Sequence, residues 1–203
     1  MKIKVCGLKY PDNIEDVSKL NINYMGFIFY PYSKRYFKSN FECLKNVNDK
    51  IKKVAVFVDE KIEVVNEIYL KNNFDYVQLH GNEDAGYCGK LNKIGVNIIK
   101  AFGIDETFDF NILNEYSEYV KYFLFDTKSC DYGGTGVKFN WNILNDKDIK
   151  TPFFLSGGIE INDIDLIKKL KIKNLYGIDI NSKFEIKPGY KDINMINKFI
   201  NEL

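Results

Sequence analysis

Eight short apolar runs, separated by amphipathic segments, are the feature that most restricts how this chain can fold. Each run is nearly continuous in apolar and β-branched residues, as expected for strands buried on both faces of a parallel sheet. We therefore predict eight strands, at residues 2–6, 24–29, 53–58, 76–79, 97–101, 122–126, 152–156 and 175–180.

The segments between these runs have the spacing of amphipathic helices. In the clearest of them, residues 61–70, the side chains of Ile62, Val65 and Ile68 fall on one stripe. Region 39–50 is less clear, with a few apolar residues at helical spacing. The other predicted helices are residues 12–20, 83–91, 108–119, 141–144, 162–170 and 193–200.

Strands that alternate with helices fit either a closed eight-fold barrel or an open, doubly wound sheet. An open sheet that binds a dinucleotide has its glycine-rich loop after the first strand, whereas the GxGxxG-like run at residues 133–136 follows the sixth. We see no interdomain linker and no short repeat. The sequence therefore predicts an α/β fold, a single-domain (β/α)8 TIM barrel over residues 1–203.

Charge and cysteine content exclude several function classes. The chain has 29 Lys and Arg residues against 28 Asp and Glu residues, so its net charge of +1 attracts nucleic acid or an anionic membrane only weakly. Its four cysteines form no CxxC pair, and His80 is the one histidine, so we expect no metal site. No signal peptide or membrane span is apparent, and we expect a reduced, cytoplasmic setting.

In a (β/α)8 barrel, active-site residues follow the strands, in the βα loops. Most of the reactive or glycine-rich residues of the chain fall at these positions. They are Cys6-Gly7-Leu8, residues 30–35, Asp59, Gln78-Leu79-His80-Gly81, Phe102-Gly103, Asp126-Thr127-Lys128, Ser156-Gly157-Gly158 and Asp179-Ile180-Asn181-Ser182.

Cys6 and Asp126 are the strongest candidates for acid–base chemistry. They end the first and sixth predicted strands, which two further strands separate around the ring. A thiolate is a usable base, and a carboxyl in an apolar setting can stay protonated and act as an acid. The two groups could therefore act on opposite faces of one substrate. The alternatives are that Cys6 is a buried packing residue and that Asp126 is a structural cap.

The loops after the last two strands are candidates for binding a phosphate. Ser156-Gly157-Gly158 and Asn181-Ser182 follow the seventh and eighth strands, where backbone N–H groups recurrently hold phosphate in this fold. Ordinary tight turns would give the same pattern.

Three other features are open to two interpretations. Residues 133–136 form either a mobile cover over the site or a plain flexible connection. Arg35 either grips a carboxylate or is a solvated surface side chain. His80 either carries protons or has a structural role.

The chain resembles the phosphoribosylanthranilate isomerases of tryptophan biosynthesis. The matching segments run in family order over nearly the whole chain. They are Lys4-Val5-Cys6-Gly7-Leu8, Gly26-Phe27-Ile28-Phe29-Tyr30 with Ser33-Lys34-Arg35-Tyr36, Gln78-Leu79-His80-Gly81, Phe125-Asp126, Gly133-Gly134-Thr135-Gly136, Leu155-Ser156-Gly157-Gly158-Ile159 and Pro188-Gly189-Tyr190-Lys191-Asp192.

The resemblance implies an Amadori rearrangement of N-(5-phosphoribosyl)anthranilate to 1-(2-carboxyphenylamino)-1-deoxyribulose 5-phosphate, without metal or organic cofactor. It implies that Asp126 is the general acid and Cys6 the general base, and that the substrate carboxylate meets Arg35. Further substrate contacts are expected from Gln78, His80 and Asp179, and phosphate contacts from Ser156, Gly157, Gly158, Asn181 and Ser182.

One departure from the family concerns the phosphate loop. The family usually has a Ser-Ser-Gly run after the last strand, but here Asn181-Ser182-Lys183 takes that place. Without the glycine, a positive φ is no longer free of steric cost. Lys183 either adds positive charge near the phosphate or points to solvent.

Two other functions compete with this one. The histidine-pathway phosphoribosyl isomerase catalyses the analogous rearrangement, but that family resembles a duplicated half-barrel and uses two aspartates. A noncatalytic phosphoribosyl-binding module is the second, and the presence of Cys6 and Asp126 argues against it. A homodimer or a pathway-enzyme partner remains open.

Overall fold

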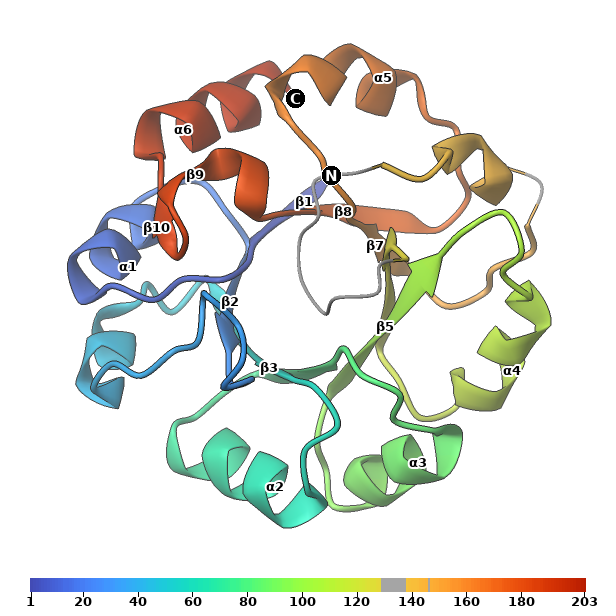
Figure 1. The fold of residues 1–203 in the computed structure, drawn as a ribbon, viewed down its shortest axis with the longest axis horizontal. Coiled ribbons are helices and arrows are strands. Elements are labelled where there is room, and N and C mark those ends of the chain that lie inside the picture. Colours follow the sequence, from blue (N-terminus) through green and yellow to red (C-terminus); the bar gives the residue numbers. More distant parts are fainter. Residues whose placement is uncertain (129–137, 146) are drawn as a thin grey trace.

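Eight parallel strands close into a barrel in the order β1 to β8 (Figure 1). The computed structural model describes residues 1–128, 138–145 and 147–203. The strands are β1 Lys2–Val5, β2 Tyr24–Ile28, β3 Lys52–Phe57, β4 Tyr76–Leu79, β5 Ile98–Ile104, β6 Tyr122–Thr127, β7 Phe153–Leu155 and β8 Leu175–Ile180. The prediction of a (β/α)8 barrel is confirmed, and each strand lies within a few residues of its predicted position.

The barrel closes where β1 pairs with β8. In this register Lys4 lies opposite Asp179 and Val5 lies opposite Ile180. Closure leaves no strand edge unpaired in the ring, which distinguishes the barrel from the open sheet that the sequence also allowed.

The α-helices form a ring outside the strands, as Figure 1 shows in the view down the barrel. They are α1 Pro11–Ser18, α2 Ile62–Lys71, α3 Ala85–Lys93, α4 Leu113–Tyr116, α5 Ile164–Lys169 and α6 Ile193–Glu202. Proline and capping side chains determine where several of these helices begin. Pro11 opens α1, while the side chains of Asp84 and Asp192 accept hydrogen bonds from backbone N–H groups in the first turns of α3 and α6.

Several predicted helices are shorter than expected. The predicted helix 108–119 is a 3-10 turn at Phe110–Ile112 followed by the single turn of α4. Asp109 caps Asn111 N–H, and the Ser117 hydroxyl donates to the Asn114 carbonyl, so local side-chain hydrogen bonds compete with a longer helix. The 3-10 helices Phe41–Asn46 and Trp141–Leu144 lie where helical spacing was noted, and a 3-10 turn at Ile161–Asp163 precedes α5.

A small hairpin after β8 was not predicted. Its strands are β9 Glu185–Lys187 and β10 Tyr190–Lys191, and Gly189 turns the chain with φ of +85°. Strands of two or three residues are too short for a periodic signal. The hairpin packs beside α1, where the Asn13 side chain bonds to both the N–H and the carbonyl of Lys191.

The core has two parts. One fills the space between the strands and the helices, and the other fills the barrel interior with Cys6, Tyr24, Val54, Val56, Ile99, Ala101, Leu124 and Phe154. Tyr24, Tyr122 and Tyr176 pack against Phe154 at the amino end of the barrel. The Tyr24 and Phe154 ring centroids lie 5.1 Å apart, and Tyr122 stacks on Tyr176 at 4.5 Å. These rings close the amino end, so a ligand can enter from the carboxyl end.

Among the described residues, no helix is long and apolar enough to cross a membrane.

A buried ion pair between Lys100 and Glu83 stabilises the loop after β4. Lys100 is 2% exposed, and its Nζ lies 2.9 Å from Glu83 Oε2 and 2.8 Å from the Gly81 carbonyl oxygen. Glu83 also accepts hydrogen bonds from the backbone N–H groups of Asp59 and Gly81. This loop directly follows Gln78 and His80, so the pair stabilises the backbone that carries them.

We expect Lys100→Met to lower the free energy of unfolding by about 3–5 kcal/mol, because it leaves a buried carboxylate without its charged partner. Denaturant titration measures this loss. Lys173→Met is the control, since its 3.9 Å pair with Asp148 is exposed and should be nearly neutral. If Lys100→Met loses no more free energy of unfolding than the control, the Lys100–Glu83 pair does not stabilise the protein.

Candidate active site

A pocket opens at the carboxyl ends of the strands, where the βα loops meet. Its lining comes from loops that are far apart in the sequence and combines apolar walls with convergent polar groups, as ligand sites do. The lining residues are Cys6, Ile28, Tyr30, Ser33, Arg35, Val56, Val58, Gln78, His80, Asp126, Ser156, Gly157, Gly158, Ile159, Asp179, Asn181 and Ser182.

The structure brings together every site residue that the sequence predicted. The candidate acid and base, the candidate substrate-binding residues and both candidate phosphate loops line the same pocket. Three residues that contact the pocket lining were missed by sequence reasoning, namely Lys4, Glu185 and Lys191. A lysine inside an otherwise apolar strand was a signal that could have revealed Lys4.

The Lys4 ammonium lies inside the barrel beside the candidate base. Lys4 is fully buried, and its Nζ forms an ion pair of 2.8 Å with Asp179 Oδ1. Burial by itself would lower the pKa of Lys4, but the charges and hydrogen bonds of Asp179 and Cys6 together outweigh it and raise that pKa. Lys4 therefore carries its positive charge close to Cys6.

The Cys6 thiol is 4% exposed, and its sulfur packs closely against Gly26, where an added Cβ would lie 2.7 Å from Sγ. Burial raises the pKa of Cys6, the Lys4 charge opposes that rise, and the Asp179 charge adds to it. The thiol form therefore predominates near neutral pH, and formation of the thiolate depends on nearby positive charge.

Asp126 sits at the end of β6 among hydrogen-bond donors. Its Oδ1 accepts from Thr127 N–H at 2.8 Å, and its Oδ2 lies 3.5 Å from His80 Nε2. The other ring nitrogen of His80 contacts Gln78 Nε2 at 2.8 Å. Gln78 is 1% exposed, so its packing orients the His80 ring toward Asp126. The structural contact that the sequence allowed for His80 is therefore present, and the ring also lies next to Asp126, while a proton-carrying role stays a prediction.

The loop after β7 turns through two glycines in the left-handed region of backbone conformation. Gly157 and Gly158 have φ of +92° and +65°, a conformation that other residues resist. The Ser156 hydroxyl lies 3.3 Å from Asp179 Oδ2, which links this loop to the end of β8.

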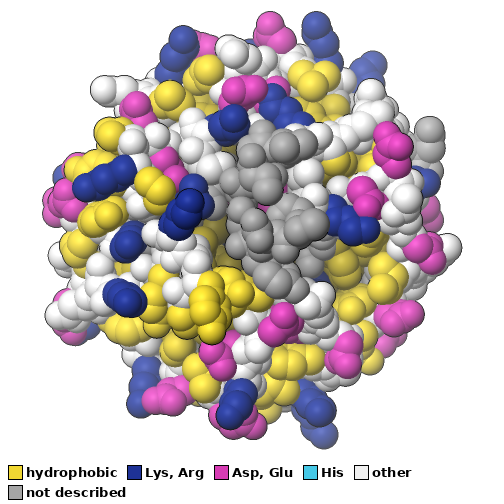
Figure 2. Space-filling model, viewed as in Figure 1, with side chains coloured by type: hydrophobic (Ala, Val, Ile, Leu, Met, Phe, Trp, Pro, Cys, Tyr) yellow, Lys and Arg dark blue, Asp and Glu magenta, His cyan; other side chains and the backbone are white. Residues whose placement is uncertain are grey.

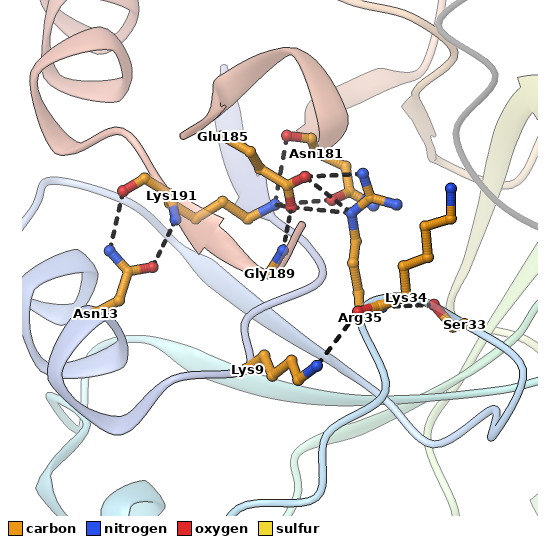
Figure 3. A network of polar contacts seen from close by, with 9 residues as sticks. All are labelled: Lys9, Asn13, Ser33, Lys34, Arg35, Asn181, Glu185, Gly189 and Lys191. Atoms are coloured by element: carbon orange, nitrogen blue, oxygen red, sulfur yellow. Dashed lines mark hydrogen bonds and ion pairs between the residues drawn. The ribbon is translucent and has the colours of Figure 1, made fainter. Parts of the chain in front are cut away.

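Arg35 is held at the pocket by a buried network, drawn in Figure 3. Its Nε and Nη2 donate to the Glu185 carboxylate at 2.8–3.0 Å. Glu185 also accepts from Gly189 N–H at 3.1 Å and from Lys191 Nζ at 2.6 Å. The solvated surface arginine that the sequence allowed is therefore not what the structure shows, since the Arg35 side chain is 13% exposed.

Lys191 extends this network to the loop after β8. Its Nζ donates to the side-chain and main-chain oxygens of Asn181 at 2.7 Å and 3.3 Å. Lys183, which takes the place of the glycine usual in the family, does not have a positive φ, so this loop does not need glycine there. Close approach matters instead at Gly7, where an added Cβ would lie 2.7 Å from both Arg35 Cδ and Asn181 Oδ1. Lys183 is exposed and does not line the pocket.

The pH dependence of stability should report on Lys191. Burial lowers its pKa to about 8, against the opposing charge of Glu185. An unfolded lysine titrates near ~10.4, so between these values the unfolded chain binds more protons and the free energy of unfolding rises with pH.

We expect the free energy of unfolding of wild type to rise, relative to that of Lys191→Met, by up to about 1.4 kcal/mol per pH unit above pH 8. Denaturant titrations below about pH 10 avoid the ionisation of tyrosines. If the free energy of unfolding of wild type stays constant or falls with pH relative to that of Lys191→Met, Lys191 does not lose its charge in the folded protein over this range.

Residues 133–136, predicted as a cover or a plain connection, lie outside the described residues. Within the described ranges, no group of three or more His, Cys, Asp or Glu side chains is placed to hold a metal ion. Figure 2 shows basic and acidic side chains intermixed around the face of the barrel seen there, as the net charge of +1 suggests.

The closed barrel, with a polar pocket at the carboxyl ends of its strands, defines the class of (β/α)8-barrel enzymes. Residues 3–202 match the family model described as N-(5'phosphoribosyl)anthranilate (PRA) isomerase. The chain belongs to this family, and its activity is the isomerisation of that substrate in tryptophan biosynthesis.

Individual relatives agree with this assignment over at least 93% of their own length. The N-(5'-phosphoribosyl)anthranilate isomerase of Parabacteroides distasonis is 44% identical over 206 residues, covering 100% of this chain and 93% of its own. A crystal structure of the isomerase from Thermotoga maritima has a TM-score of 0.83 at 31% identity, covering 100% of this chain and 98% of its own. That enzyme has also been solved as monomers generated from its dimeric form, at 29% identity and a TM-score of 0.79, covering 100% of this chain and 97% of its own.

A further structure of an isomerase of this family was solved in complex with reduced 1-(o-carboxyphenylamino)-1-deoxyribulose 5-phosphate. It is 28% identical to this chain, with a TM-score of 0.80, and covers 100% of this chain and 97% of its own.

Proposed function

We propose that the chain catalyses its isomerisation with Asp126 as general acid and Cys6 as general base. The observation that carries this assignment is their presence in one pocket that also holds a paired arginine and the glycine-rich loop after β7. The substrate offers a carboxylate at one end and a phosphate at the other, so these groups suit its two ends.

In the first step Asp126 gives its proton to the ribose ring oxygen. The bond between that oxygen and C1 breaks, and the anthranilate nitrogen lone pair forms an iminium with C1. Asp126 is left as a carboxylate, whose two oxygens face Thr127 N–H and the His80 ring. These groups favour the charge that develops on the acid during the step.

In the second step the Cys6 thiolate removes the proton from C2. The electron pair of the C2–H bond forms a C1–C2 double bond, and the iminium electrons return to nitrogen. The resulting enolamine becomes the ketone when a proton moves from the C2 hydroxyl to C1. The positive iminium favours the thiolate while the proton is being transferred.

The Glu185 contact prepares Arg35 to bind the substrate carboxylate. Glu185 takes the edge of the guanidinium formed by Nε and Nη2. The edge formed by Nη1 and Nη2 remains for a second carboxylate, and the first pair fixes its direction. Gln78, His80 and Asp179 complete the substrate contacts, and Ser156, Gly157, Gly158, Asn181 and Ser182 the phosphate contacts.

We expect Arg35→Lys to raise KM by about tenfold or more, because an ammonium cannot form two parallel hydrogen bonds with each of two carboxylates. Steady-state kinetics measure the change, and kcat should fall less than kcat/KM. Lys38→Arg, on the same loop but outside the pocket lining, is the control. An unchanged KM would place the carboxylate elsewhere.

The activity itself is tested by following the loss of phosphoribosylanthranilate fluorescence, with the substrate generated in place. Fast loss of fluorescence that depends on the protein supports the proposal, and no loss of fluorescence with folded protein would contradict it. The histidine-pathway aminoaldose is tested in parallel, because an equal rate with it would favour the rival isomerase.

A second copy of the chain is our proposal for its partner. The support is the dimeric Thermotoga maritima relative. Light scattering on the purified protein distinguishes a dimer from a monomer, and a monomer would leave a pathway enzyme as the partner to test. A cytoplasmic setting is likewise a proposal, supported by the free thiols of Cys6, Cys43 and Cys88.

A further inference from the structure

Lys4 is a fully buried lysine whose presence inside the barrel the fold alone does not explain. Removing an ammonium from water is costly, so interior positions of barrels are mostly filled by apolar side chains. Lys4 lies on β1, and Cys6 follows two residues later, directly after the strand, so both side chains point to the same side, into the barrel. Asp179 is the register partner of Lys4 on β8 and forms its ion pair of 2.8 Å.

The charged groups around Cys6 come from several elements. Lys4 lies on β1, Asp179 on β8 and Lys191 on β10. Arg35 and His80 line the pocket from loops, and Asp126 lines it from the end of β6. Of the charges that act on the thiol, Lys4 has the largest effect, followed by the opposing Asp179 and then Lys191. The pair of Lys4 and Asp179 is neutral as a whole, yet its positive end dominates at the sulfur.

We propose that Lys4 is a positioning residue that sets how readily Cys6 gives up its proton, and that Asp179 moderates this effect. The proposal rests on the proposed function of Cys6 as the base. When Cys6 is a thiolate, the Lys4 ammonium stabilises its negative charge in place of the water that burial excludes. When the thiolate takes the proton from C2, the new S–H bond removes that negative charge, and Lys4 returns to its pair with Asp179 alone.

The moderating role of Asp179 has a chemical reason. An unpaired ammonium beside Cys6 would hold the thiolate so strongly that it became a weak base. The negative charge of Asp179 offsets part of the effect of the ammonium on Cys6, which keeps the sulfur basic enough to remove a carbon-bound proton. The two residues thus act on Cys6 in opposite directions.

This opposition separates the proposal from a purely structural ion pair. If the pair served solely to join β1 to β8, loss of either partner would lower stability and leave the proton equilibrium of Cys6 unmoved. If the proposal is correct, loss of Lys4 and loss of Asp179 shift that equilibrium in opposite directions.

The test is a titration of the Cys6 thiolate by its ultraviolet absorbance. Each variant is measured against the same variant carrying Cys6→Ser, which subtracts tyrosinate and the other cysteines. We expect Lys4→Met to move the midpoint to higher pH by about 1–3 units, and Asp179→Asn to move it to lower pH. Lys52→Met is the control, because Lys52 begins β3 at the amino end of the barrel, forms its ion pair with Asp75 there and should leave the midpoint unchanged.

Two further measurements keep the outcome decisive. Lys4→Met combined with Asp179→Asn carries no unpaired buried charge, so it tests the midpoint if the single variant does not fold, and it too should titrate above wild type. In kinetics, Lys4→Met should lower kcat at neutral pH and recover it as the pH rises, with KM nearly unchanged. Midpoints that coincide with wild type, or that move in the same direction in both single variants, overturn the proposal.

Failure of this inference is distinguishable from failure of the proposed function. If Cys6→Ser alone retains full turnover, Cys6 is not the base and the proposed function is wrong. If Cys6→Ser is inactive but the midpoints do not move, the base assignment stands and the role of Lys4 is overturned.

Discussion

Cys6→Ser is expected to lower kcat by about 10²–10⁴-fold, the usual contribution of a positioned general base. A serine hydroxyl ionises far less readily than a thiol, so it cannot take the proton from C2. KM should change little, because the substrate carboxylate and phosphate are held by other residues. Serine is smaller than cysteine, so the close contact with Gly26 does not prevent folding.

The kinetic isotope effect sharpens this prediction. With substrate deuterated at C2, the isotope effect on kcat should increase in Cys6→Ser, because breaking the C2–H bond becomes rate-limiting. Cys43→Ser is the matched control, since Cys43 is partly exposed and lies outside the pocket lining. Turnover of Cys6→Ser close to that of the control would remove Cys6 from the mechanism.

The second large effect is expected for Asp126→Asn, which should lower kcat by a similar factor of about 10²–10⁴. Asparagine has nearly the same shape and can still accept the hydrogen bond from Thr127 N–H, but it has no acidic proton for the ring oxygen. The fold and the affinity for inorganic phosphate should therefore survive. The affinity is measured by calorimetry and the fold by circular dichroism.

Here the isotope effect should change in the opposite direction. Because ring opening becomes rate-limiting in Asp126→Asn, deuterium at C2 should affect kcat less than in wild type. Asp49→Asn, at an exposed position between β2 and β3, is the control. An increased isotope effect in Asp126→Asn would assign Asp126 to the proton-abstraction step instead of ring opening.

The strands and the site positions could be predicted from the sequence because both depend on local pattern. A strand buried on both faces needs a continuous apolar run, such as Phe123-Leu124-Phe125, and a residue that ends such a run lies at the barrel mouth. Cys6 and Asp126 were found in this way. The short helical turns were less predictable, because side-chain hydrogen bonds such as that of Ser117 compete with helix formation.

The partners of the charged residues could not be predicted, because they lie far apart in the chain. Arg35 meets Glu185 from 150 positions away, and Lys4 meets Asp179 from 175 positions away. The sequence suggested Arg35 as a carboxylate ligand but contained no signal that Glu185 would orient it. The hairpin that carries Lys191 was too short to detect, so the charge that Lys191 places against Asn181, in the loop after β8, was missed as well.

The sequence by itself determined the alternation of strands and helices, the end of the barrel at which chemistry occurs, and the candidate acid and base. These follow from local hydrophobic patterning and from the order of residues along each strand. The tertiary structure alone decided that the ring closes with Lys4 opposite Asp179, and that Glu185 and Lys191 join Arg35 to Asn181. Burial is the physical reason, since a charge removed from water requires a partner, and only the folded chain brings that partner within reach.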